Sequence, residues 1–226
     1  MIRSTLVAAV VMVLAGRAAA DDRKLVVKAE AAPPPQELAA PVRGLLDGTA
    51  LTVSDGQGKL LCTIWPRKEL PSKADAAKAK AGLTYADFDE SLIVGAVKFP
   101  QVWTDFRKQK IQPGVYTLRL GKQPMDGDHM GTAPYDDFCL LCPAKQDTKP
   151  DLLETKPLQE LSSLSTTRKH PGVMLTFPNP MPADAPTTEA KQNDIWVVNY
   201  KRPATASGQP AVMGFSLVLI GQSMAE

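Results

Sequence analysis

The sequence has few of the residues from which catalytic and metal sites are most often built. Its 226 residues include only two histidines and three cysteines, and aromatic residues make up 6% of the chain. A serine–histidine–acid triad would therefore have to use His129 or His170. The serine-elbow, Walker, dinucleotide-binding and zinc-protease motifs are missing as well, which argues against the enzyme classes that depend on them.

Long apolar runs are also missing, and the N-terminus has only a short one. Arg3 is followed by the apolar run Leu6–Leu14 and by the small residues Ala18–Ala20, which is the pattern of a secretory signal cleaved before Asp21. The run is shorter than the roughly 20 apolar residues that cross a bilayer. We therefore predict a signal peptide at residues 1–20, an exported protein in the periplasm or outside the cell, and no membrane span after cleavage.

Neither sign of charge is in excess in the mature chain. Removal of Arg3 and Arg17 lowers the count of Lys and Arg from 26 to 24, which equals the count of 24 Asp and Glu. This balance argues against nucleic-acid binding and against a polybasic membrane-surface protein. The expected partner is a small ligand, or a protein or cell-surface partner.

The three cysteines are Cys62, Cys139 and Cys142, and their odd number leaves at least one thiol unpaired within the monomer. The last two have the spacing of a redox pair. They lie in an apolar run typical of a strand, where an offset of three residues places side chains on opposite faces. We therefore interpret them as buried structural cysteines rather than as a catalytic dithiol.

Short runs rich in Val, Ile, Leu, Thr and aromatic residues alternate with turns marked by 20 prolines and 15 glycines. They predict nine strands, at Leu25–Ala29, Ala50–Val53, Lys59–Trp65, Leu92–Phe99, Val115–Leu120, Asp137–Cys142, Val173–Phe177, Ile195–Tyr200 and Val212–Ile220. In the fifth, Tyr116, Leu118 and Leu120 alternate with more polar residues and should face the core.

Helical signals are fewer. Ser72 is a candidate cap for a short helix over 73–81, and Pro157 opens a second helix with leucines on one side. The pattern predicts a mainly β protein: a single antiparallel β-sandwich, jelly-roll or immunoglobulin-like, with one or two short helices. We expect an N-terminal strand and proline-rich linker over 21–41 and the sandwich domain over 42–226, with polar loops at 179–191 and 202–210.

One loop gathers several side chains that can bind metals. Asp126 and Asp128 have the spacing of the first and third ligands of a calcium loop, but Met130 stands where Asp or Asn is wanted and Asp137 where Glu is wanted. An EF-hand is therefore rejected, and an irregular calcium site is left as one hypothesis. The alternative is a tight turn in which His129 bonds a neighbouring carbonyl group.

The same loop offers ligands for copper. His129 and Met130 supply imidazole and thioether, and His170 and Met174 form a second such pair later in the chain. The metal-site candidates are thus His129, Met130, Asp126, Asp128, His170 and Met174, with copper or calcium as the cofactor. Asp136 and Asp137 precede an apolar strand, and Arg119 is a candidate partner for one of them.

Four runs, PGVYTLRL, QPMDGDHMG, DFCLLCPA and HPGVMLTFP, resemble an uncharacterised family of secreted bacterial proteins of β-sandwich type. The resemblance covers about residues 92–177. It implies an exported domain of β type and no particular activity.

Three functions are compatible with these observations. The first is an exported, non-enzymatic β-sandwich that binds a ligand or a partner. The second is a periplasmic copper-binding protein that uses the histidine and methionine residues above. The third is a hydrolase whose carboxylates come from separate strands and are not recognisable from spacing.

Overall fold

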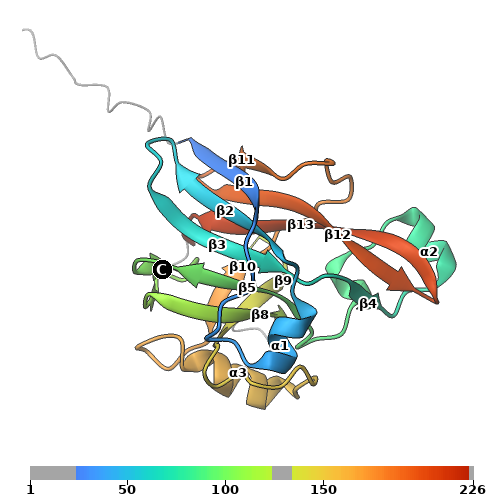
Figure 1. The fold of residues 1–226 in the computed structure, drawn as a ribbon, viewed down its shortest axis with the longest axis horizontal. Helices are drawn as coiled ribbons and strands as arrows, with labels where there is room; N and C mark the ends of the chain where they lie inside the picture. Colours follow the sequence, from blue (N-terminus) through green and yellow to red (C-terminus); the bar gives the residue numbers. More distant parts are fainter. Residues whose placement is uncertain (1–23, 124–133, 224–226) are drawn as a thin grey trace, which may run out of the picture.

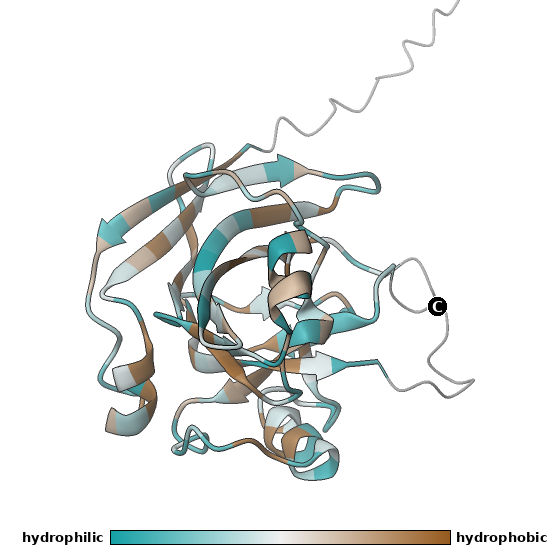
Figure 2. Ribbon diagram, turned by 90° about the vertical axis from the view of Figure 1, so that its right-hand side faces the viewer, coloured by the Kyte–Doolittle hydropathy of each residue, from teal (hydrophilic) through white to brown (hydrophobic). Residues whose placement is uncertain are grey.

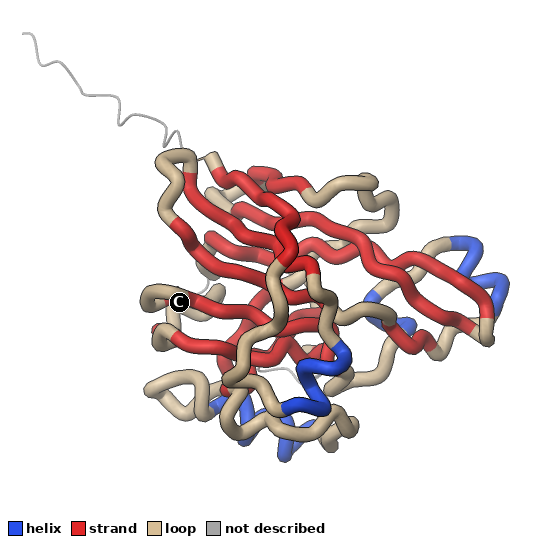
Figure 3. The backbone as a smooth tube through the Cα atoms, in the orientation of Figure 1, coloured by secondary structure: helices blue, strands red, loops and turns tan. Residues whose placement is uncertain are grey.

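The computed structural model describes residues 24–123 and 134–223, which form two facing β-sheets with short helices at their margins (Figures 1 and 3). The prediction of a mainly β sandwich with few short helices is confirmed. The predicted signal peptide at residues 1–20 lies outside the described residues. Within them, no helix is long and apolar enough to cross a membrane.

The first sheet is an antiparallel meander, because each strand pairs with the next sheet strand along the chain. Its connections are sequential, and in this it differs from jelly rolls and immunoglobulin domains, where some connections cross from one sheet to the other. From one edge to the other the strands are β1 (Leu25–Ala31), β2 (Thr49–Asp55), β3 (Leu60–Pro66), β5 (Ile93–Phe99), β8 (Gly114–Lys122), β9 (Asp137–Pro143) and β10 (Gly172–Leu175).

The second sheet is built on a long hairpin. Its strands are β11 (Thr187–Ala190), β12 (Trp196–Ala206) and β13 (Gln209–Ile220), with β4 (Leu70–Ser72) parallel to the end of β12. Ser207 and Gly208 have φ angles of 48° and 72°, and two left-handed residues in a two-residue turn favour the twist of a tight hairpin. The short strands β6 (Trp103–Thr104) and β7 (Lys110–Ile111) pair separately.

The main core lies between the two sheets. Tyr116, Leu118 and Leu120 point into it from β8, as their alternation predicts. The sheets approach each other along two seams. At one, Thr176 bridges to Leu217 of β13; at the other, the Thr188 hydroxyl donates to the Leu25 carbonyl at 2.7 Å.

Helices and loops cover the outer face of the first sheet over its middle strands, so β5, β8 and β9 are buried on both sides, whereas the edge strand β1 is mostly exposed. Helix α1 (Ala40–Leu45) packs with Trp65 and Ile93, while α3 (Thr155–Ser163) places Leu158 against Leu140 of β9. Apolar residues follow the strands, and the surface loops are mainly hydrophilic (Figure 2). Helix α2 (Ala76–Ala81) and the 3-10 helix η1 (Tyr85–Asp87) lie beside the hairpin and the core.

Four stretches differ from the sequence-based expectations. The proline-rich segment leads into α1, with Pro in its first turn, and β1 joins the same sheet as the rest of the chain. The loop expected at 179–191 contains β11, and the one expected at 202–210 belongs to the hairpin. Helix α2 starts later than expected, because Asp75 rather than Ser72 accepts from the free backbone N–H of Lys78. Strand β11 and the end of β12 contain many polar, partly exposed residues, so their apolar pattern is weak and their sequences resemble loops.

Candidate functional site

The predicted metal ligands fall in three different environments. Asp126, Asp128, His129 and Met130 belong to residues 124–133, outside the described residues. His170 is exposed in the loop before β10, whereas Met174 is fully buried in the main core, paired across the sheet with Cys139. Residues 24–123 and 134–223 contain no group of three His, Cys, Asp or Glu side chains placed to hold a metal ion.

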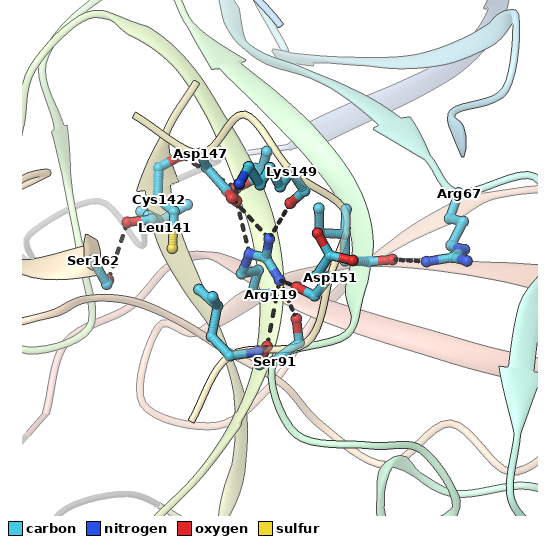
Figure 4. A network of polar contacts seen from close by, with 12 residues as sticks. Arg67, Ser91, Arg119, Leu141, Cys142, Asp147, Lys149, Asp151 and Ser162 are labelled. Carbon is cyan, nitrogen blue, oxygen red and sulfur yellow. Dashed lines mark hydrogen bonds and ion pairs between the residues drawn. The ribbon is translucent and has the colours of Figure 1, made fainter. Parts of the chain in front are cut away.

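A buried polar cluster surrounds Arg119, on the outer face of β8. Its side chain is fully buried, and its guanidinium contacts both carboxylate oxygens of Asp147, Nε to Oδ2 at 2.7 Å and Nη2 to Oδ1 at 2.8 Å (Figure 4). The partner predicted for Arg119 was Asp136 or Asp137, and this prediction is wrong. Asp137 is instead the first residue of β9, where it pairs with Lys122 of β8, and Asp136 directly precedes it.

Backbone carbonyl groups occupy the other guanidinium donors. Nη1 donates to Ser91 at 2.7 Å and to Asp151 at 2.9 Å, and Nη2 donates to Lys149 at 2.7 Å. With both Asp147 contacts, these bonds use the five N–H groups that a guanidinium carries. The cluster therefore fastens the segment 144–153 to the sheet and offers no donor to a ligand.

A pocket opens at the end of the sandwich where β5 ends and β3 begins. We name it the end pocket; its volume is about 140 Å³. Both sheets contribute to it, since its lining includes the start of β3, the turn after β5 and the end of β13. The lining residues are Lys59, Leu60, Leu61, Cys62, Phe99, Gln101, Val102, Trp103, Leu219 and Ile220.

Aromatic stacking holds one wall of the end pocket in place. The rings of Phe99 and Trp103 are parallel within 7°, with centroids 4.7 Å apart. The Trp103 indole N–H donates to the Leu219 carbonyl of the opposite sheet at 2.8 Å. This bond satisfies the polar end of the indole and leaves its apolar surface available. Leu60 and Val102 remain exposed, by 39% and 51%.

Cys62 contributes a thiol to the lining of the end pocket. It is buried, and desolvation raises the pKa of its thiol to about 12. The thiol is therefore protonated near neutral pH and is a weak nucleophile.

A second pocket of about 240 Å³, which we name the polar pocket, is lined by Tyr85, Pro134, Tyr135, Asp136, Asp137, Thr176 and Pro178. Burial and the like charge of Asp136 raise the pKa of Asp137, while Lys122 opposes the shift. Antiparallel pairing puts the two pockets at opposite ends of the first sheet, because β5 ends at the end pocket and β8 ends beside Asp137.

The remaining cysteines confirm the strand-based interpretation. Cys139 faces the main core and Cys142 the opposite face beneath α3, and both are buried and free of disulfides. Burial raises the pKa of both thiols, to about 12 for Cys139. A buried pair on opposite faces cannot exchange disulfides with a substrate.

Sequence reasoning missed the end pocket altogether. One signal was present: the run FPQVW places Phe99 and Trp103 on either side of Pro100 and an exposed valine. Two aromatic residues separated by a three-residue turn can stack and form one wall of a pocket, as Phe99 and Trp103 do.

Comparisons with protein-family models, with curated proteins and with solved structures found no match to this chain.

Proposed function

We propose that this protein is an exported, non-enzymatic binding module that takes a small, mainly apolar ligand in the end pocket. The observation that carries the proposal is the apolar cavity of about 140 Å³ between the two sheets. A cavity of about 150 Å³ lined by Leu, Ile and Phe in another protein stays dry and binds benzene. One aromatic ring or a short aliphatic chain is therefore the size of ligand that fits.

The wall of the pocket supports a binding role because it is held before any ligand arrives. The stacked pair Phe99 and Trp103 is tied to the second sheet through the indole hydrogen bond to Leu219. A preformed wall lowers the cost of ordering side chains on binding. For a ligand of one ring we expect a dissociation constant of about 0.1–1 mM.

The exposed rim gives a direct test. Replacement of Val102, 51% exposed at the mouth of the pocket, by tryptophan should fill the opening without disturbing the core. Val212 is 50% exposed on β13, away from the pocket lining, so Val212→Trp is a matched control. Saturation-transfer NMR with toluene and benzyl alcohol should show binding to wild type and to Val212→Trp, and loss of binding to Val102→Trp. Equal binding to all three proteins would place the ligand elsewhere.

A second candidate function, hydrolysis, is supported by the polar pocket. A carboxyl group with a raised pKa is suited to act as a general acid, and Asp137 has this property. Its test is turnover of a panel of glycoside and ester substrates by wild type, Asp137→Asn and Asp136→Asn. Hydrolysis requires activity in wild type that Asp137→Asn abolishes; an inactive wild type would remove this candidate for the substrates in the panel.

A further inference from the structure

We infer that the end pocket selects small amphiphiles with an anionic head group, namely monocarboxylates whose apolar part enters the cavity and whose carboxylate meets Lys59. This inference rests on the proposed function, because it names the class of ligand for the same site. It follows from three features of the pocket: its charge, the polar groups at its rim and its size.

The lining residues carry one formal charge, and it is positive. Lys59 is exposed at the pocket, and its ammonium group has no hydrogen-bond or ion-pair partner among residues 24–123 and 134–223. Some other surface lysines are paired with carboxylates: Lys98 lies 3.5 Å from Glu37, and Lys191 lies 2.6 Å from Glu189. An unpaired cation at the rim of an apolar pocket complements an anion on the end of an apolar ligand.

Two hydrogen bonds with Asp55 fix the backbone position of Lys59. Its N–H donates to the Asp55 carboxylate at 2.9 Å, and its carbonyl accepts from the Asp55 N–H at 3.0 Å. This closed turn between β2 and β3 fixes the backbone of Lys59 beside the end pocket. The flexible stem can follow apolar surface while the ammonium group stays in water.

Gln101 supplies a second polar group. It is exposed in the turn after β5 and lines the same pocket as Lys59. Its amide N–H groups can donate to a carboxylate, whose two oxygens accept several hydrogen bonds. The lining contains no carboxylate that would repel an anion.

The cavity volume sets the probes for the test. A ring-sized cavity of about 140 Å³ leaves a short substituent at the rim. Phenylacetate, 2-phenylethanol and 2-phenylethylamine share one skeleton and carry negative, zero and positive charge at pH 7. Affinities measured by NMR titration at low salt should fall in that order, with phenylacetate about two- to fivefold tighter than the alcohol, as for a solvent-exposed ion pair. The preference should shrink in 0.5 M NaCl.

Variants separate the charge from other effects. Lys59→Ala should remove the preference for phenylacetate, Lys59→Arg should keep it, and Lys59→Glu should favour the amine. Lys156→Ala, on α3 against β9, changes the net charge equally and should leave the preference intact. Melting temperatures of all variants check that they fold.

Two outcomes would overturn the inference, and they differ. If wild type binds all three probes equally, or if Lys59→Ala keeps the preference, the head-group assignment is wrong while the apolar pocket stands. If wild type binds none of the three probes, the proposed function fails together with this inference.

Discussion

Arg119 and Asp147 form a bidentate ion pair on the outer face of the first sheet, although they are 28 residues apart in the chain. Arg119 is 0% exposed and Asp147 is 3% exposed, so neither charge is hydrated by bulk water. The Thr117 hydroxyl also donates to the Asp147 carboxylate. A buried charge is tolerated only when such contacts replace water.

Removal of one partner of this pair should therefore be costly. Asp147→Ala leaves the Arg119 charge buried with only neutral partners, and we expect the free energy of unfolding to fall by about 3–5 kcal/mol. Urea unfolding monitored by circular dichroism measures it. The exposed pair of Lys98 and Glu37, at 3.5 Å, is the control, and Glu37→Gln should cost less than about 1 kcal/mol. Similar losses in the two variants would contradict the structural role assigned to the buried pair.

The cysteines should behave as buried, protonated thiols. We expect Ellman's reagent to react with native protein at pH 8 far more slowly than with protein in urea. The Cys139→Ser, Cys142→Ser variant should be less stable by about 1–3 kcal/mol per unpaired hydroxyl and should still bind ligand in the end pocket. Insulin-reductase activity of wild type would oppose this interpretation.

The same thiols predict a loss of stability in base. The pKa of Cys62 and of Cys139 is raised from 9.0 to about 12 in the folded protein. Above pH 9 the unfolded chain therefore loses thiol protons that the folded chain keeps, which favours unfolding. The stability of wild type relative to Cys62→Ala should fall as the pH rises from 9 towards 12, and a relative increase would be evidence against the shift.

Asp105 should make stability depend on pH in the acid range. It is fully buried, and desolvation raises its pKa above 3.8, although it accepts hydrogen bonds from the Gln109 N–H at 2.7 Å and the Val173 N–H at 3.2 Å. Above pH 3.8 the folded protein therefore binds more protons than the unfolded chain, so stability falls as the pH rises through this window. Urea titrations from pH 3.5 to 7 should show the advantage of wild type over Asp105→Asn shrinking as the pH rises. An advantage that grows with pH would contradict the shift.

The copper hypothesis stays a prediction that rests mainly on His129 and Met130. If it is correct, isothermal titration with copper should show binding by wild type that His129→Ala abolishes. Met174→Leu should leave binding unchanged and cost less than about 1.5 kcal/mol, because the Met174 thioether is fully buried in the core. Absence of copper binding by wild type would reject the hypothesis, and calcium titration with Asp128→Ala tests the alternative metal in the same way.

Strands with an apolar face could be predicted from the sequence, whereas features made by distant segments could not. The alternation of Tyr116, Leu118 and Leu120 predicts β8 and its core face. The same alternation places Arg119 away from the core, where arginine is normally solvated. Its burial depends on the segment 144–153, which covers it through backbone carbonyls that no residue type signals.

The end pocket escaped prediction for a related reason. Its walls come from the start of β3, the turn after β5 and the end of β13, so Leu60 and Leu219 are far apart in sequence. Local patterns identify both as strand residues and cannot show that the ends of their strands meet. Leu60 and Leu219 meet only because the two sheets pack face to face.

The seam between Leu25 and Thr188 has a consequence for the order of folding. It joins the first described strand to β11, across 163 residues, and the partner strands β12 and β13 come later still. The meander can assemble from neighbours as the chain is synthesised, but its inner face stays uncovered until the last strands arrive. Completion of this core is therefore a late, long-range event, and chains truncated before β11 should expose the apolar face of the first sheet and aggregate.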